Sequence, residues 1–314
     1  MNFYTDRDNI EHDPNTVVTI GTFDGIHKGH VDILHTVINK ANELNGRNFV
    51  ITFEPHPRTV VSSEYKMKIL TTIDEKKELF EKLNVENLLV INFTSEFSQM
   101  NYEDFIKTYI LDKIGAKHIV IGYDHKFGKN RSGDENKLRE LGKAYGFDVT
   151  VVSAVEESDD PISSTKIRTA LEEGDLEKAN NYLGWDYSFT GKVVEGSSRG
   201  RIIGFHTANV ELIDSNKLIP ARGVYLVRCY VEGEKYFGLM NIGYRPTFED
   251  DKNIVVEVHL LDFNKDIYGK QIKVELLNRI RNEKKFESKE ALVHQINIDK
   301  DKALEIINNL INSG

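Results

Sequence analysis

The sequence predicts two domains: an α/β domain with a parallel, doubly wound sheet in residues 1–186, and a small antiparallel β-barrel in residues 187–314. In the first part, strand-like and helix-like patterns alternate along the chain, which is typical of a parallel sheet with helices on its faces. In the second part, short segments of β-branched and aromatic residues alternate with glycine turns, as in small barrels. An amphipathic helix at 299–311 closes the chain.

The composition narrows the class of protein. The chain has 314 residues and a formal net charge of -9, with 39% hydrophobic and 29% charged residues, as in a folded domain protein. A general nucleic-acid binder is usually basic, so that class is disfavoured. The single cysteine, Cys229, excludes an internal disulfide and a multi-cysteine metal site. Because we find no signal-like N-terminus and no apolar run of membrane length, we expect a cytoplasmic enzyme.

The first part shows the strand–helix alternation in detail. Buried strands are predicted at 17–20, 48–53, 87–93, 117–122 and 149–152. Helices are predicted at 31–38, 72–83 and 101–114. Ligands of open α/β sheets bind beyond the carboxyl ends of the strands, so the segments that follow these strands are the candidate binding loops.

The segment GTFDGIHKGH at 21–30 joins the first strand to the first helix. A helix N-terminus carries unpaired N–H groups and partial positive charge, so a glycine turn at this place favours phosphate binding. His27 and His30 are three residues apart and therefore project to the same side of a helical turn. Two imidazoles beside such a site can neutralise charge that develops on a phosphoryl group. We therefore predict a phosphate site in which both histidines act catalytically.

Three further loops carry groups suited to a nucleotide. The segment EPHP at 54–57 holds His56 in an extended loop, with an incidental histidine in a rigid turn as the alternative. The glycine-punctuated segment 123–134 contributes cations that can contact phosphates. The segment PISSTKIR at 161–168 opens a helix with three hydroxyl residues, which offer helix caps and phosphate donors together.

The second part also contains a candidate phosphate and metal site. Its strands are predicted at 187–194, 224–231, 236–242 and 254–261. The run GRIIGFHTAN at 200–209 contains glycines, which allow a backbone to approach phosphate closely. Thr207 and Asn209 lie two residues apart, so on a strand they share one side and can offer oxygen ligands to Mg²⁺. Glu257 shares one face of its own strand with His259.

These motifs resemble a known family. H-x-G-H is the signature of the nucleotidyltransferase superfamily, and the longer GTFDGIHKGH is similar to the prokaryotic FAD synthetases, which are bifunctional riboflavin kinase/FMN adenylyltransferases. The segments at 53–57, 122–128 and 162–168 resemble further nucleotidyltransferase motifs of that family. GRIIGFHTAN is similar to the riboflavin kinase signature G-R-x-L-G-F-P-T-A-N, and the segments at 256–263 and 278–286 resemble other kinase-family segments.

The resemblance implies a Rossmann-like nucleotidyltransferase domain at 1–186 and a riboflavin kinase barrel with a C-terminal helix at 187–314. It implies phosphorylation of riboflavin to FMN and adenylylation of FMN to FAD with release of pyrophosphate, with ATP as co-substrate and Mg²⁺ as cofactor. The expected partners are riboflavin, FMN, FAD and ATP, and neither a nucleic acid nor a membrane.

The resemblance also assigns roles to individual residues. The implied catalytic residues are His27, His30, Arg168 and Glu257. The implied substrate-binding residues are Gly21, Phe23, Asp24, Gly25, His56, Asp124, Phe127, Ser163, Ser164, Thr165, Gly204 and Arg279. The implied metal ligands are Thr207 and Asn209.

Two residues depart from the family's pattern: His125 stands where an aromatic Phe is common, and His206 replaces the usual proline. Two other functions remain open at this point. One is an adenylyltransferase for another phosphorylated substrate, and the other is a flavin-binding regulatory protein with a decayed kinase half. Each of these functions requires that folding bring the histidine turn close to the distant serine segment at 162–168.

Overall fold

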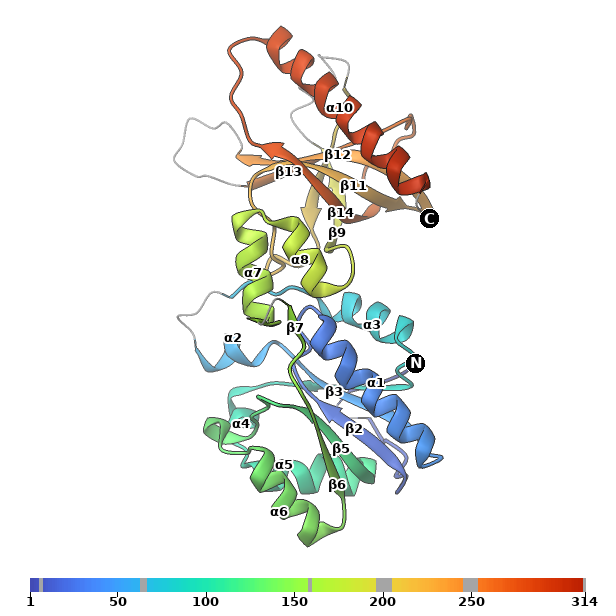
Figure 1. The fold of residues 1–314 in the computed structure, drawn as a ribbon, viewed down its shortest axis with the longest axis vertical. Coiled ribbons are helices and arrows are strands. Elements are labelled where there is room, and N and C mark those ends of the chain that lie inside the picture. The colour runs from blue at the N-terminus through green and yellow to red at the C-terminus, as the bar shows by residue number, and fades with distance from the viewer. Residues whose placement is uncertain (6–7, 63–66, 158–159, 196–204, 245–253, 313–314) are drawn as a thin grey trace. The chain divides into compact units, whose positions relative to one another are not determined.

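The computed structural model describes residues 1–5, 8–62, 67–157, 160–195, 205–244 and 254–312. The chain divides into two compact units, Met1–Ser164 and Thr165–Gly314. The first unit has a parallel sheet with helices and the second has an antiparallel barrel followed by a helix, so the predicted fold class is confirmed (Figure 1).

The first unit is built on a six-stranded parallel sheet with the order β1-β4-β3-β2-β5-β6. The strands are β1 (Asn2–Thr5), β2 (Thr16–Ile20), β3 (Asn48–Glu54), β4 (Asn87–Asn92), β5 (Ala116–Gly122) and β6 (Asp148–Val152). From β2, the chain adds β3 and β4 on one side and then returns to place β5 and β6 on the other. Ligands of open α/β sheets bind where the strand order reverses, so the ends of β2 and β5 are the expected place for a site.

Helices cover both faces of this sheet (Figure 1). They are α1 (Lys28–Glu43), α2 (Pro57–Val61), α3 (Ile73–Lys82), α4 (Ser95–Ser98), α5 (Tyr102–Phe105), η1 (Ile106–Ile114), η2 (Lys129–Arg131) and α6 (Glu135–Tyr145). Successive residues of a strand point to opposite faces. Val17 therefore packs with Val37 of α1, whereas its neighbour Val18 packs in the core that includes Ile110 of η1.

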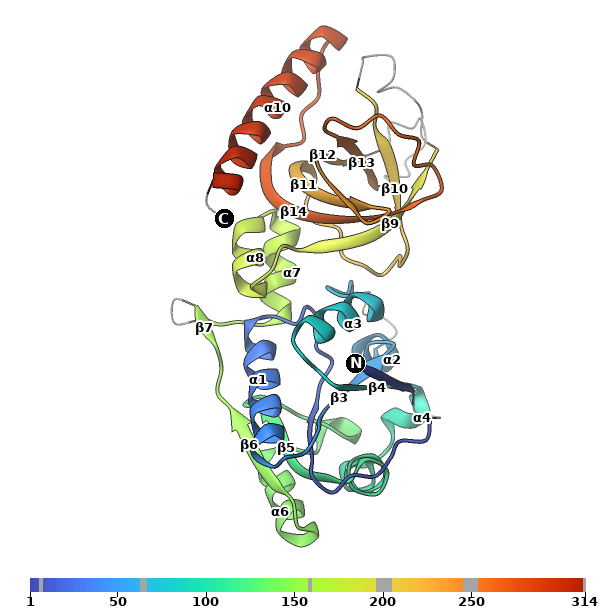
Figure 2. The same cartoon turned by 90° about the vertical axis from the view of Figure 1, so that its right-hand side faces the viewer.

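The second unit begins with α7 (Ser164–Glu173) and α8 (Leu176–Leu183), and a closed barrel follows. The barrel strands are β9 (Ser188–Val194), β10 (Ala208–Leu212), β11 (Gly223–Val231), β12 (Glu234–Tyr244), β13 (Ile254–Leu260) and β14 (Gln271–Asn282). The helix α10 (Lys289–Asn312) packs Ala303 and Ile307 against Leu226 and Leu239 on the outside of the barrel (Figure 2). Cys229 is a buried thiol, in agreement with its position in a strand-like sequence.

Several elements differ from the prediction. The run at 101–114 forms α5 followed by η1, a π-helix, and α10 begins at Lys289, ten residues before the predicted start. The strands β1 and β14, the helix α6 and the short hairpin of β7 (Glu156–Glu157) and β8 (Asp160–Pro161) were not predicted. β1 and β14 were missed because their pairing partners, β4 for β1 and β11 and β9 for β14, are distant in sequence.

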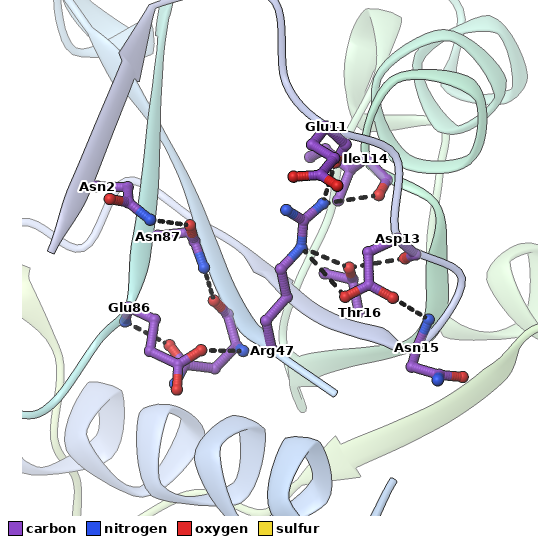
Figure 3. A network of polar contacts seen from close by, with 10 residues as sticks. Asn2, Glu11, Asp13, Asn15, Thr16, Arg47, Glu86, Asn87 and Ile114 are labelled. Carbon is purple, nitrogen blue, oxygen red and sulfur yellow. Dashed lines mark hydrogen bonds and ion pairs between the residues drawn. The ribbon is translucent and has the colours of Figure 1, made fainter. Parts of the chain in front are cut away.

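The amino ends of the strands are joined by polar side chains (Figure 3). Arg47, just before β3, donates from Nε to Thr16 Oγ1 at 2.9 Å and from Nη2 to the carbonyl oxygens of Ile114, at 3.1 Å, and of Glu11. In the same way, Asn87 links neighbouring strands, because its Oδ1 accepts from Asn2 and its Nδ2 donates to the Asn48 carbonyl. This edge lies opposite the carboxyl ends and holds the strands together.

We predict that Arg47→Met lowers the free energy of unfolding of the first unit by about 2–3 kcal/mol, because it leaves two carbonyl groups and a hydroxyl without their donor. Urea unfolding followed by circular dichroism measures the loss. The matched control is Lys40→Met, which removes the surface ion pair of Lys40 with Glu43 and should cost less than about 1 kcal/mol. Equal losses for the two variants would contradict the role given to Arg47.

Candidate functional site

The turn between β2 and α1 is strained and buried. Phe23, Gly25 and Ile26 have positive φ values of 46°, 91° and 36°, a region that only glycine enters at little cost. The side chains of Phe23 and Ile26 are 2% and 1% exposed and pack in one core cluster with Leu34 and Phe80. The burial of these two side chains holds the turn in this conformation, and strain maintained in this way is common at functional sites.

His27 and His30 leave this turn side by side. Their rings are stacked with centroids 3.7 Å apart and an interplanar angle of 17°, as the three-residue spacing predicts. A Cβ atom at Gly29 would lie 3.3 Å from His27 Cε1 and Nδ1, so the glycine leaves room for the ring. The edge of Phe23 packs on His30 at 5.2 Å. Neighbouring residues thus fix the orientation of both imidazoles.

The surroundings keep both imidazoles neutral near pH 7. Burial lowers the pKa of His27 to about 4, while the charges of Asp24 and Asp124 act in the opposite direction. Burial also lowers the pKa of His30 well below its ordinary value, and nearby His27 and Lys76 add to this effect. Within the described ranges, the buried Nδ1 atoms of His27 and His30 have no hydrogen-bond partner.

Two backbone N–H groups of the predicted glycine turn make hydrogen bonds within the protein. Gly21 donates its N–H to the Ile51 carbonyl at 3.0 Å, and Gly25 donates to Thr71 Oγ1 at 2.9 Å. These two N–H groups are therefore engaged inside the protein, and phosphate binding by the turn stays a prediction. His27 is the N-cap of α1 and makes no side-chain cap there, so the first turn of that helix is the remaining source of amide donors.

Asp24 connects the turn to two other segments. Its Oδ1 accepts hydrogen bonds from the backbone N–H groups of Leu70, at 2.8 Å, and Thr71, at 3.0 Å. Its carbonyl oxygen accepts a bond of 2.8 Å from Ser164 Oγ, across 140 residues of sequence. The histidine turn and the serine segment therefore meet, as the prediction requires. Ser163 lies beside Ser164 in the same unit.

The second unit contains the rest of the serine segment. Thr165 and Arg168 lie in α7, where Thr165 is exposed and Arg168 is buried. Their part in the nucleotide site stays a prediction.

The other predicted loops follow β3 and β5. His56 caps α2, because its Nδ1 accepts the Arg58 N–H at 3.1 Å, which places the ring proton on Nε2. Asp124, just after β5, is close enough to His27 for its charge to raise that imidazole's pKa. His125 stacks on Phe127 with centroids 5.5 Å apart, so the histidine that replaces the usual Phe retains an aromatic contact.

In the barrel, strand register brings the predicted kinase residues together. Asn209 of β10 lies directly opposite Glu257 of β13, and Glu257 lies opposite Asn241 of β12. Directly opposite residues project to the same face, so these three side chains form a row. Asn241 was not among the predicted residues, because only the register places it beside Glu257. Thr207 precedes β10, which begins at Ala208.

The segment before β10 is held by His259. Its Nδ1 lies 2.8 Å from the His206 carbonyl oxygen and therefore donates to it, and its ring packs edge-on against Phe205 at 5.4 Å. This contact restrains the place where His206 replaces the usual proline. Gly204, a predicted binding residue, lies outside the described residues.

Arg279, another predicted binding residue, is held by the protein itself. Its Nη2 donates to the Arg222 carbonyl at 2.8 Å and its Nη1 to the Gly174 carbonyl at 3.4 Å. Among the described residues, its Nε has no hydrogen-bond partner. The guanidinium is thus fixed in place by these two hydrogen bonds.

Comparison with known proteins decides which family these two sites belong to. Family models match residues 9–166 as FAD synthetase and residues 183–307 as riboflavin kinase. A Bacillus subtilis protein described as a bifunctional riboflavin kinase/FMN adenylyltransferase is 39% identical over 96% of this chain and 95% of its own. Relatives with the same description are 39% identical in Listeria monocytogenes, over 91% of both chains, and 37% identical in Escherichia coli K12, over 92% of both. This chain belongs to the bifunctional riboflavin kinase/FMN adenylyltransferase family.

Family membership makes the chain a transferase with both activities, riboflavin kinase and FMN adenylyltransferase, and ATP is the co-substrate of each. The FAD synthetase match contains the histidine turn, and the riboflavin kinase match contains the barrel. Neither alternative function is favoured, because both halves match.

A solved structure from Streptococcus pneumoniae, described as a macrolide-efflux protein, has the same fold. It matches with a TM-score of 0.87 at 32% identity and covers 96% of this chain and 98% of its own. That description is of the pneumococcal protein alone. The structural match supports the fold of this chain. In the part of the chain that the structure describes, we find no helix that is both long and apolar enough to span a membrane.

Sequence reasoning missed Thr71 and Lys76, which contact the histidine turn. Thr71 bonds to Gly25, and Lys76 Nζ donates to the Thr22 carbonyl at 2.9 Å. Lys76 precedes Phe80 by four residues and so interrupts the apolar stripe of α3, which is a usable signal. Thr71 gives no such signal, since its contact lies 46 residues away in sequence.

We predict that the first unit loses stability as the pH falls from 6.5 to 4, partly through His27. Its folded pKa, about 4, lies below its ordinary value of 6.5, so in this window the unfolded chain binds a proton that the folded chain does not. The contribution of His27 to the free energy of unfolding is therefore fully present above pH 6.5. It is lost as the pH falls toward 4, by on the order of 3 kcal/mol. Urea unfolding across this range should show a weaker pH dependence for His27→Asn. His35→Asn, an exposed position of α1, should retain the wild-type dependence.

Proposed function

We propose that the two activities of the family use two separate sites, one near the histidine turn and one near the Asn209–Glu257 row. The single observation that carries the first site is the stacked, neutral pair of His27 and His30 at the reversal point of the sheet. The second rests on the register that places Asn209 beside Glu257. FMN made at the barrel is then the substrate of the first unit.

At the first site, an oxygen of the FMN phosphate attacks the α-phosphorus of ATP. The bond from this phosphorus to the bridging oxygen breaks, and pyrophosphate leaves. His27 and His30 donate N–H groups to the phosphate oxygens, and Arg168 adds positive charge. An anionic triphosphate raises the pKa of a neighbouring imidazole, so positive character develops on the histidines when the ligand binds. No covalent enzyme intermediate is needed, and positioning supplies much of the rate.

The remaining predicted residues bind the substrates of adenylyl transfer. We assign phosphate contacts to Ser163, Ser164 and Thr165, which lie at the start of α7. We assign flavin or nucleotide contacts to Gly21, Phe23, Asp24, Gly25, His56, Asp124 and Phe127. Asp24 and His56 also have structural bonds, so they act mainly by shaping the site.

At the barrel site, Glu257 accepts the proton of the ribityl hydroxyl as that oxygen attacks the γ-phosphorus of ATP, and ADP leaves. Thr207 and Asn209 would hold Mg²⁺, since a hydroxyl and an amide oxygen are the hard ligands that this ion takes. Mg²⁺ supplies charge neutralisation of the ATP phosphates when bound. We assign Gly204 to phosphate approach and Arg279 to flavin binding, as the family resemblance implies.

We propose a domain boundary at residue 186, which gives domains at 1–186 and 187–314. The second family match begins at residue 183, near this point, whereas α7 and α8 pack in the second compact unit. The substrates and products are riboflavin, FMN, FAD and ATP, and we assign no role to nucleic acids or membranes. The net charge of -9 agrees with the first of these exclusions. We place the enzyme in the cytoplasm.

We predict that His27→Ala lowers FAD formation by at least about 100-fold and leaves FMN formation unchanged, because it removes a donor to the transferred phosphoryl group. The assay incubates the protein with riboflavin or FMN and Mg-ATP and separates the flavins by chromatography. If a folded His27→Ala protein lost both products, the model of two separate sites would be wrong.

We predict the reverse for Glu257→Gln, which retains the shape of the side chain but cannot accept the proton. FMN formation from riboflavin should fall by at least about 100-fold, whereas added FMN should still be converted to FAD. Unchanged kinase activity in this variant would exclude Glu257 as the base.

A further inference from the structure

We propose that Lys76 is a positioning residue for adenylyl transfer, which braces the histidine turn and offsets the negative charge of two carboxylates beside it, the buried Asp24 and the half-buried Glu54. The inference rests on the assignment of His27 and His30 to this reaction. We do not assign Lys76 a contact with substrate.

The ammonium group of Lys76 is buried and bonds to the histidine turn. Lys76 is 2% exposed, and its Nζ donates to the Thr22 carbonyl at 2.9 Å. Thr22 lies in the turn that precedes His27, and its carbonyl also accepts from Thr52 Oγ1 at 3.2 Å. Lys76 thus reaches from α3 to the turn, at the same carbonyl that Thr52 of β3 bonds.

The charge of Lys76 lies close to two carboxylates. A buried ammonium group is costly unless negative groups lie close to it. Burial lowers the pKa of Lys76, and the carboxylates of Asp24 and Glu54 act in the opposite direction. Asp24 follows β2 and Glu54 ends β3, so the ammonium lies near the carboxyl ends of adjacent strands. Without Lys76, both carboxylates would repel the phosphates of ATP.

The charge of Lys76 also acts on the histidine pair. Lys76 and His27 are the ionisable groups whose charges act on His30, and the Phe23 ring packs on the same imidazole. Both charges lower the pKa of His30. Loss of the ammonium group therefore makes His30 easier to protonate, a change that a purely structural brace would not cause.

The test compares Lys76→Met with Lys76→Arg, and Lys82→Met is the matched control at an exposed position of α3. We expect Lys76→Met to lower kcat/KM for ATP in FMN adenylylation by about 10-fold or more, with riboflavin phosphorylation unchanged. Lys76→Arg, which retains the charge, should recover part of the loss. In histidine-labelled protein, NMR titration should show a higher pKa for His30 in Lys76→Met. Lys82→Met should match the wild type in all these measurements.

The outcomes separate this inference from the site assignment. Normal FAD formation by His27→Asn would mean that the histidines are wrongly assigned. A strong loss with His27→Asn, together with wild-type adenylylation and an unchanged His30 pKa in Lys76→Met, would overturn the inference about Lys76 alone. If Lys76→Met does not fold, Lys76→Gln replaces it, since it retains a donor without the charge. Equal adenylylation by the Gln and Arg variants would then overturn the role of the charge.

Discussion

The first unit depends on the hydrogen bonds of one buried residue, Asp24. Its carboxylate accepts two backbone N–H groups from the segment that leads into α3, and its carbonyl accepts the hydroxyl of Ser164. Three segments that are far apart in sequence therefore converge on a residue three positions before His27. A carboxyl group that is 1% exposed needs hydrogen-bond donors, and these contacts supply them. The arrangement of the histidine pair follows from them.

The two edges of the parallel sheet have different chemistry. At the amino edge, Arg47 and the asparagines satisfy backbone carbonyls and each other. At the carboxyl edge, the turn contains residues with positive φ, and the imidazoles of His27 and His30 are kept neutral by burial. Strain and desolvation reduce stability, and here they occur beside the reversal point where a nucleotide is expected. The amino edge compensates by holding the strands together.

In the barrel, strand pairing brings the predicted site residues together, as the turn does for His27 and His30 in the first unit. Asn209 and Glu257 are 48 residues apart in sequence, yet antiparallel register places them opposite each other. A shift by one residue would move either side chain to the other face of the sheet. His259 adds a restraint by donating to the carbonyl of His206, so the segment before β10 is fixed although it lacks the usual proline.

The sequence by itself determined the fold class, the strands next to the predicted motifs and the family, because periodicity and short motifs are local properties of the chain. It placed His27 and His30 on one side of a helical turn correctly, since that depends only on helix geometry. It did not give β1, the row formed by Asn241 with Glu257, or the contact of Lys76 with Thr22. Each of these is a pairing between distant segments, and only the tertiary structure decided them, because the free energy that selects such a pair comes from burial and hydrogen bonds that exist only in the folded protein.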